Sequence, residues 1–359
     1  MLASNRSAFC YAFPVFRKGD ERGIHKTTAA TAQEIIEAES NKEYIPNRKG
    51  RKTGVEIKKV SIIGLGALGI MFGHHLAQRM PKEDLRIIAD RERIRRYREE
   101  KVYCNGQPCE FHYVAPDEPC EPADLLLFTV KFQGLRDAIE AARGHVGENT
   151  VILSALNGIT SEAIIGEAYG MDKVLYCVAQ GMDAVKTGNR LTYVNMGMLC
   201  FGDREPGIVS PRTKRVAAFF DAVDFPYMID TDMRKRMWGK FMLNVGVNQT
   251  VAVYESNYGA VQREGEQRDT MIAAMREVIA LSEKEGVNLS EDDLQYWLKV
   301  LGTLSPDGKP SMAQDVEAKR PSEVELFAGT VIALGEKHGV PTPVNRELYE
   351  RILEKESKY

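Results

Sequence analysis

A glycine motif directly after a short strand constrains the fold of this chain more than any other feature. Val60–Ile63 is rich in β-branched residues and predicts a buried strand. A helical pattern then runs to about Arg79. The motif itself consists of Gly64, Leu65, Gly66, Ala67, Leu68 and Gly69. Between a strand and a helix, this G-x-G-x-x-G spacing provides a tight turn, a close backbone approach for a pyrophosphate and helix amides that hold phosphates. It therefore predicts a dinucleotide site; a glycine turn without a ligand is the alternative.

Further strand patterns alternate with helical ones along the first half of the chain. Leu85–Ala89 predicts a second strand, and two apolar runs, Asp124–Val130 and Val151–Ser154, are typical of parallel strands covered on both faces. We therefore expect a Rossmann-type, doubly wound α/β domain over residues 58–208. Residues 1–57 lack such patterns, and we interpret them as a flexible extension. An all-helical C-terminal domain is expected over residues 209–359, from helical patterns at Arg212–Val223, Met233–Val253, Glu264–Glu285, Glu291–Leu301 and Arg320–His338.

Composition excludes several classes of function. Lys and Arg number 48 against 51 Asp and Glu, so no basic field points to nucleic acid. No run approaches the ~18 apolar residues of a transmembrane helix, and we expect no membrane partner. The six cysteines are scattered, which argues against a disulfide framework and favours the cytoplasm. Cys104 and Cys109 have only His112 nearby and lack a four-ligand spacing, so we predict no metal site.

The end of the second strand carries residues that could choose between two dinucleotides. Asp90 stands at this end, and Arg91 and Arg93 follow it. An acid at this place can bind the ribose 2′-hydroxyl of NAD, whereas a nearby arginine can bind the 2′-phosphate of NADP. Both residue types are present, so the residues alone leave the cofactor open. The two arginines could also be a solvated helix start.

A polar stripe runs along an otherwise apolar helix. Lys240, Asn244 and Asn248 are spaced four residues apart and therefore share one helix face. Apart from Asn244, all residues from Phe241 to Val247 are apolar or glycine. Burying such a stripe without polar partners is costly, so we interpret it as the wall of a cleft for an oxygen-rich small substrate. A buried structural network or an exposed face are the alternatives.

Other polar residues lie where open α/β sheets bind ligands. Lys131 follows one predicted strand and Asn157 follows the next, both at carboxyl ends. A solvated lysine and an ordinary turn are the alternatives there. Ser311, at the end of the breaker-rich loop 302–312, and Glu323 belong to a second polar group, although Glu323 could simply begin a helix.

These ordered motifs resemble those of the ketopantoate reductase (2-dehydropantoate 2-reductase) family. The resemblance runs from about Lys58 into the C-terminal region. It rests on the glycine motif and on segments 128–131, 156–158, 238–248 and 311–315, the last leading to Glu323. It implies a Rossmann domain and a helical domain with the active site between them.

The resemblance also implies roles for single residues. Lys240 is similar to the catalytic lysine that protonates a forming alkoxide, and Glu323 to an acid that contacts both cofactor and site. Such a lysine, with an ordinary pKa of ~10.4, stays charged at neutral pH. Substrate-binding roles are implied for Asn157, Asn244, Asn248 and Ser311. Cofactor contacts are implied for the glycine motif, Asp90, Arg91, Lys131, Asn157, Ala184 and Glu323.

We therefore expect reduction of ketopantoate to (R)-pantoate by hydride transfer from NADPH, in pantothenate and coenzyme A biosynthesis. NADH is the alternative cofactor, because Asp90 departs from the arginine that the family often has there. Tyr258 stands where the family often has a substrate-contacting asparagine, so reduction of another branched 2-oxo acid is a second hypothesis. A dinucleotide-binding sensor without turnover is a third. A 2-oxo acid is the expected small-molecule partner, and a homodimer is a further expectation.

Overall fold

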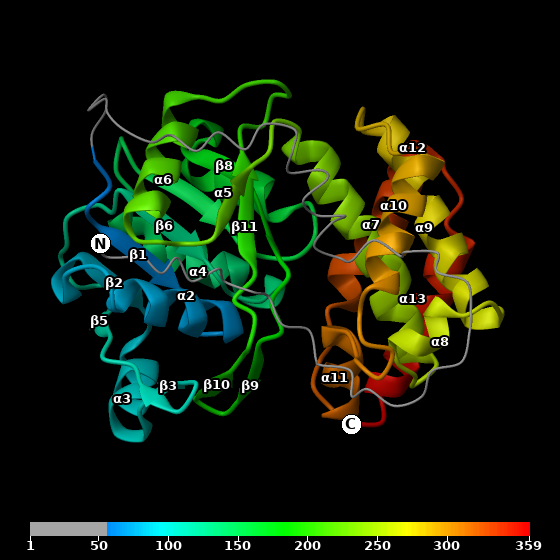
Figure 1. The fold of residues 1–359 in the computed structure, drawn as a ribbon, viewed down its shortest axis with the longest axis horizontal. Helices are drawn as coiled ribbons and strands as arrows, with labels where there is room; N and C mark the ends of the chain where they lie inside the picture. Colours follow the sequence, from blue (N-terminus) through cyan, green and yellow to red (C-terminus); the bar gives the residue numbers. More distant parts are fainter. Residues whose placement is uncertain (1–55) are drawn as a thin grey trace, which may run out of the picture.

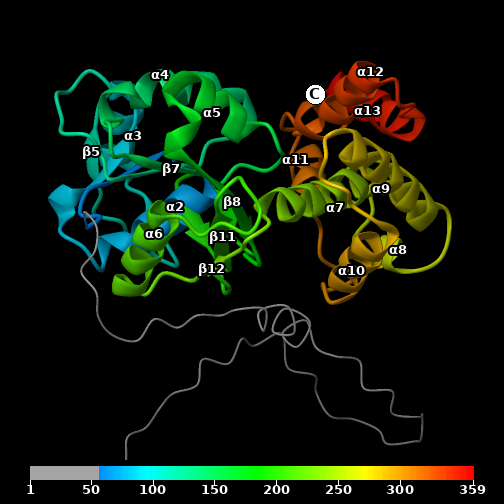
Figure 2. The ribbon, with the colours of Figure 1, turned by 90° about the horizontal axis from the view of Figure 1, so that it is seen from above.

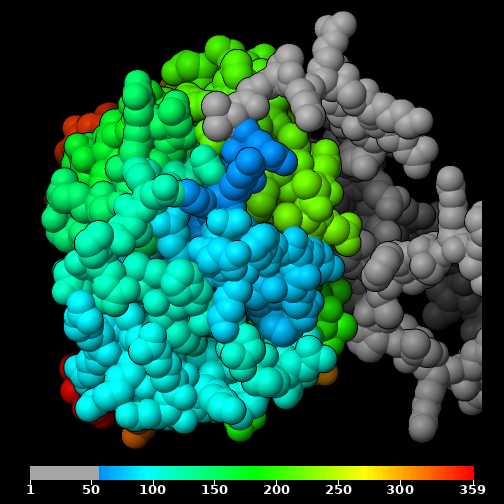
Figure 3. All heavy atoms as spheres, turned by 90° about the vertical axis from the view of Figure 1, so that its left-hand side faces the viewer, coloured from blue at the N-terminus to red at the C-terminus, as the bar shows by residue number. Residues whose placement is uncertain are grey.

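The computed structural model describes residues 56–359 as two domains that lie side by side (Figures 1 and 2). The extension expected over 1–57 lies outside the described residues, except for its last two positions. Viewed from the α/β side, the helical domain is almost entirely hidden behind the α/β domain, and only small orange and red areas emerge at the margin (Figure 3). The two domains are joined mainly where α7 (Met233–Val253) reaches the sheet (Figures 1 and 2).

An eight-stranded sheet forms the centre of the first domain. Its order is β12-β11-β8-β7-β6-β1-β2-β5, and the strands from β8 to β5 run parallel. The bounds are β1 Val60–Ile63, β2 Leu85–Ile88, β5 His112–Val114, β6 Leu125–Phe128, β7 Val151–Ser154, β8 Val174–Gln180, β11 Met198–Gly202 and β12 Tyr227–Ile229. All residues of β1, β2, β6 and β7 are buried, as expected for parallel strands with helices on both faces. The predicted α/β fold is confirmed.

Helices cover both faces of this sheet. Helices α2 (Ala67–Ala77) and α6 (Pro211–Ala222) pack on one face. Helices α4 (Leu135–Ala142) and α5 (Ser161–Tyr169) pack on the other, while α3 (Arg91–Glu100) lies near the β2 edge. By packing, α6 and β12 belong to this domain, although both follow the boundary that we expect at 208/209. The reason is that the apolar side chains of α6 enter the core beside Phe201 of β11.

The sequence predicts extra strands over Tyr176–Phe201 that complete the first domain, but it does not reveal their pairing or the second sheet to which some of them belong. Strand β11 runs antiparallel to β8, so the sheet is mixed at this edge. A separate four-stranded sheet has the order β4-β3-β10-β9, with β3 Tyr103–Cys104, β4 Gln107–Pro108, β9 Val185–Thr187 and β10 Arg190–Thr192. These strands have two or three residues each, too few for a readable alternation of apolar and polar positions.

The second domain is helical and is built around α7 (Met233–Val253), which runs from beside the sheet into its middle (Figures 1 and 2). Around α7 lie α8 Tyr258–Gln262, α9 Glu266–Lys284, α10 Glu291–Gly302, α11 Ser311–Glu317, α12 Thr330–His338 and α13 Pro343–Glu356. The single helix predicted over 320–338 is wrong in its first part. Pro321 lies in an irregular segment, and a π-helix over Glu325–Gly329 leads into α12. Within residues 56–359, no helix has both the length and the apolar content that a membrane span needs.

Candidate active site

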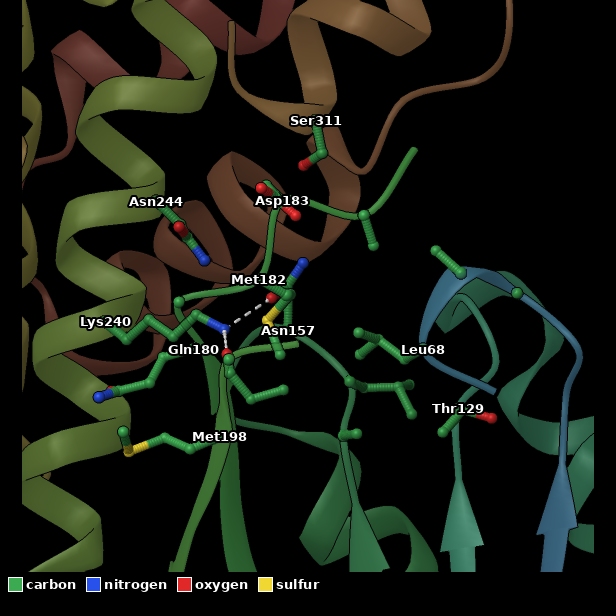
Figure 4. A pocket seen from close by; sticks show the side chains of 18 of the residues that line it. Leu68, Thr129, Asn157, Gln180, Met182, Asp183, Met198, Lys240, Asn244 and Ser311 are labelled. Carbon is green, nitrogen blue, oxygen red and sulfur yellow. Dashed lines mark hydrogen bonds between the residues drawn. The ribbon is translucent and has the colours of Figure 1, made fainter. Parts of the chain in front are cut away.

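A cleft of about 3330 Å³ lies between the two domains. The carboxyl ends of the parallel strands form one wall, and α7 with the segment around α11 forms the other. Figure 4 shows Lys240 and Asn244 extending from α7 toward the α/β domain, with Asn157 opposite Lys240 and Ser311 on α11. The cleft thus brings together residues that are far apart in the sequence.

The glycine motif forms the turn between β1 and α2 at one end of this cleft. Gly64 has a φ of +99°, and a Cβ on Gly69 would lie 1.9 Å from the carbonyl oxygen of Gly64. The first and third glycines are therefore required for the turn and for the close start of the helix. The Thr129 hydroxyl, which sequence reasoning missed, donates to the Gly64 carbonyl oxygen at 2.6 Å and fixes the turn from β6.

The start of α2 fits a phosphate-bearing cofactor. Its N-cap is Gly66, which offers no side-chain acceptor to the first amides of the helix. A Cβ on Gly66 would meet only the Thr129 carbonyl oxygen, at 3.4 Å, so the front of the turn stays open toward the cleft. Free first-turn amides and the positive end of the helix dipole favour a phosphate there. Leu65, Ala67 and Leu68 also line the cleft beside this turn.

Lys240, Asn157 and Glu323 form a polar network across the cleft. The Lys240 ammonium donates to Asn157 Oδ1 at 3.1 Å and to the carbonyl oxygen of Ala179, on β8, at 2.5 Å. The amide nitrogen of Asn157 donates to Glu323 Oε2 at 3.3 Å. Asn157 therefore links a cation from α7 with an acid that precedes the π-helix, and it does so from the end of β7.

The surroundings of this network shift both of its titratable groups. Burial lowers the pKa of Lys240 to about 8, and the nearby Cys177, Cys200 and Glu323 oppose the shift. The ordinary lysine pKa that we expected is therefore wrong, because the helix packs this ammonium against the sheet. Burial also raises the pKa of Glu323, while the hydrogen bond from Asn157 opposes that shift. The pKa values of both groups therefore lie closer to neutral pH than those of free side chains.

The predicted polar stripe continues along α7. Asn248 donates from its side-chain amide to Asn244 Oδ1 at 3.2 Å, and Asn248 itself is buried. Ser311 begins α11 and is exposed toward the cleft, with no capping bond from the preceding Pro310. Lys240, Asn244, Asn248 and Ser311 all line the cleft, so hydroxyl and amide groups share it with the Lys240 ammonium.

Lys131 meets an acid of the other domain. Its ammonium lies 2.8 Å from Asp315 Oδ2, and Arg320 Nε lies 2.9 Å from Asp315 Oδ1. Asp315 is only 6% exposed, so this carboxylate needs its cationic partners. Asp315 belongs to a motif seen in the sequence, but the sequence indicates no role for it, because its partner Lys131 lies 184 residues away. The pair joins the end of β6 to α11 across the cleft.

The residues after β2 separate in space. Asp90 lines the cleft, caps α3 by accepting from the Arg93 backbone amide at 2.7 Å, and pairs with the Arg93 side chain at 3.3 Å. Arg91 pairs instead with Asp117 at 2.8 Å and is absent from the cleft lining, whereas Arg93 is present. Ala184, between β8 and β9, lines the cleft.

This arrangement suits the reduction of a carbonyl group. A cation with a lowered pKa lies beside hydrogen-bond donors for a carboxylate or hydroxyl. A dinucleotide-type turn lies in the same cleft. Negative charge that develops on a carbonyl oxygen near Lys240 would be stabilised and then protonated by the ammonium.

Comparison with known proteins agrees with this geometry. The ketopantoate reductase PanE/ApbA family model matches residues 60–205, and the model of the family's C-terminal domain matches residues 232–356. A 2-dehydropantoate 2-reductase from Aquifex aeolicus is 26% identical over 313 residues, covering 84% of this chain and 97% of that relative.

Solved structures share the fold. D-mandelate dehydrogenase in complex with NADH has a TM-score of 0.73 at 20% identity, covering 84% of this chain and 99% of that one. A dimeric ketopantoate reductase from Staphylococcus aureus has a TM-score of 0.67 at 20% identity, with the same coverage of 84% and 99%. The two family matches together take in both domains and every residue of the Lys240–Asn157–Glu323 network. This chain therefore belongs to the ketopantoate reductase family.

Proposed function

We propose that this protein reduces 2-dehydropantoate to (R)-pantoate with NADPH, and so serves pantothenate and coenzyme A biosynthesis in the cytoplasm. The observation that carries the proposal is the Lys240–Asn157–Glu323 network in the same cleft as the glycine turn. The relative from Aquifex aeolicus, named for this reaction, supports the substrate.

Lys240 and Glu323 have separate roles in the proposed reaction. A reduced nicotinamide, when bound, supplies the hydride to the 2-oxo carbon. Lys240 stabilises the growing charge on the oxygen and then donates its proton to it. Glu323 acts with Lys240 as the second catalytic residue: through Asn157 it fixes the direction of the ammonium, and its negative charge favours the protonated lysine.

Substrate binding falls to the rest of the cleft wall. Asn244 extends from α7 one turn away from Lys240, and Asn248 and Ser311 line the same cleft, so the wall offers amide and hydroxyl groups. Donors of this kind satisfy a carboxylate and a hydroxyl, which are the two polar groups that 2-dehydropantoate carries besides its ketone.

The cofactor proposal is NADPH, with NADH as the alternative. Each carboxylate oxygen of Asp90 already has a contact with Arg93, one to the backbone amide and one to the side chain, which partly neutralises the acid that would otherwise favour NAD. Arg93 lies at the cleft and offers a cation to a 2′-phosphate. D-mandelate dehydrogenase, solved with NADH, keeps the alternative open for this fold.

A second candidate is the reduction of a different branched 2-oxo acid. Tyr258 favours it, because its half-buried ring lines the cleft together with apolar side chains such as Trp297 and Leu304, a surface suited to a larger apolar group. The shared fold of D-mandelate dehydrogenase supports a wider range of 2-hydroxy acids. We further propose a homodimer, by analogy with the Staphylococcus aureus enzyme.

The test is the substrate-dependent loss of absorbance at 340 nm, with NADPH and then NADH, against 2-dehydropantoate and a panel of branched and aromatic 2-oxo acids. The proposal expects kcat/KM to be highest for 2-dehydropantoate with NADPH. A clear preference for another 2-oxo acid would establish the second candidate. Nucleotide binding without turnover of any acid would instead indicate a sensor.

A further inference from the structure

A buried chain of hydroxyl groups underlies the loop that carries Asn157. This loop, residues 155–160, connects β7 to α5, with Ser154 at its start and Ser161 at its end. The hydroxyl oxygens of Ser154 and Ser161 lie 2.8 Å apart, and Ser161 donates to Glu162 Oε2 at 2.9 Å. All three residues are at most 2% exposed, although none of them touches the Lys240–Asn157–Glu323 network.

The donors and acceptors of this chain point in one direction. Because the Ser161 hydroxyl hydrogen is used on Glu162, the bond between the serines needs Ser154 as its donor. The Leu156 amide in turn lies 3.5 Å from Ser154 Oγ. The sequence of donors thus runs from the loop backbone through both serines to a carboxylate, and bonds in such a chain strengthen one another.

Glu162 is costly to place there. Burial raises its pKa to about 7, although hydrogen bonds from the backbone of Glu162, from the Ser161 hydroxyl and from the backbone of Cys177 oppose the shift. A carboxylate at the first turn of a helix gains from the helix dipole, but an exposed acid would gain that too. The free-energy cost of burying this carboxylate is explained better if its hydrogen bond fixes the two serines in position.

The loop that carries Asn157 is also restricted in its conformation by the helical domain. Gly158, next to Asn157, has a φ of +91°, and a Cβ there would lie 2.6 Å from the Leu326 side chain of the π-helix. The loop is therefore pressed against the helical domain on one side and anchored by the serines on the other. Asn157 sits between these two supports.

We propose that Glu162, acting through Ser161 and Ser154, is a positioning residue. It fixes the place of the Asn157 side chain in the cleft and so the direction of the Lys240 ammonium. The inference rests on the proposed function only in that Asn157 serves the reaction. The effect of Glu162 and the two serines on kcat should therefore depend on Asn157, and it should vanish when the Asn157 side chain is removed.

The first test is a double-mutant cycle on kcat. Ser161→Ala should lower kcat about tenfold, the rate equivalent of one lost hydrogen bond, and less than twofold when Asn157→Ala is already present. Glu162→Gln, which keeps the shape but replaces the charged acceptor by a neutral one, should lower kcat about threefold with the same dependence on Asn157. An equal loss in both backgrounds, or no loss in either, would overturn the proposal.

A matched control separates positioning from stability. Thr213, in the first turn of α6, also donates from a buried hydroxyl to a buried carboxylate, Asp203, at 2.7 Å. Thr213→Ala should lower the unfolding temperature as much as Ser161→Ala does, yet leave kcat within twofold. A similar loss of kcat in Thr213→Ala would show that general loosening of the domain explains the effect.

The second test needs no substrate. Acetylation of Lys240 by acetic anhydride, followed by mass spectrometry over a pH series, reports the pKa of its amine. Ser161→Ala weakens the acceptor Asn157 Oδ1, so the midpoint should fall by about half a pH unit. A shifted midpoint in a protein that reduces no 2-oxo acid would support the inference while refuting the proposed function. An unchanged midpoint would overturn the inference and leave the proposed function standing.

Discussion

The lowered pKa of Lys240 predicts an unusual pH dependence of the reaction. Lys240 must be protonated to donate its proton, and burial lowers its pKa to about 8. For a single site with this pKa, the protonated fraction falls from about nine-tenths at pH 7 to about one-tenth at pH 9. The kcat/KM for the 2-oxo acid should therefore fall about tenfold between these pH values. A lysine with an ordinary pKa of ~10.4 would lose less than about a twentieth of its protonated form over the same range.

The assay is NADPH oxidation at saturating nucleotide and constant ionic strength from pH 6.5 to 9.5. Glu323→Gln provides an internal check of the sign. The negative charge of Glu323 favours the ammonium, so its removal should move the break in the profile to lower pH. Nucleotide affinity measured at each pH controls for effects on cofactor binding. A rate that stays level to pH 9, or a break that moves upward in Glu323→Gln, would refute the assignment of this pKa to Lys240.

Three further predictions follow from single contacts. Gly69→Ala places a Cβ 1.9 Å from a backbone oxygen and should weaken nucleotide binding at least about a hundredfold by fluorescence titration, whereas Gly302→Ala, with open space around it and outside the cleft lining, should not. Asp315→Asn removes the charge that joins Lys131 to the helical domain; a loss of about 1 kcal/mol should lower the unfolding temperature by about 2–4 °C in calorimetry, and an unchanged temperature would contradict the role of this pair. Asp90→Ala should leave the NADPH to NADH ratio of kcat/KM unchanged if Asp90 serves only as the α3 cap, while a ratio shifted toward NADPH would show that it holds the ribose.

Local patterns were enough to predict the elements that position the site. The strand before Gly64 and the helix after it are specified by neighbours in sequence, and the structure has them at Val60–Ile63 and Ala67–Ala77. The helix carrying Lys240 was predicted over Met233–Val253 and is observed with the same bounds. Spacing along a helix is fixed by its geometry, so the shared face of Lys240, Asn244 and Asn248 also followed from the sequence.

Properties that depend on packing between distant segments could not be predicted. The bond from Asn157 to Glu323 spans 166 residues, and that from Lys131 to Asp315 spans 184. No periodicity records which loop meets which helix. The pKa of Lys240 depends on the strand packed against it, so the residue type alone gave an ordinary value. The place of α6 in the first domain has the same origin, because its apolar face fits a sheet as well as it fits other helices.

The central claim is that Lys240 donates the proton in the reduction of a 2-oxo acid, and Lys240→Ala tests it most directly. The measurement is the steady-state and single-turnover oxidation of NADPH at 340 nm with 2-dehydropantoate, for the unaltered protein and the variant. The account predicts that kcat falls by about a hundredfold or more, the scale of general acid catalysis, while NADPH binds as before. Turnover close to that of the unaltered protein would remove Lys240 from the mechanism and contradict the account.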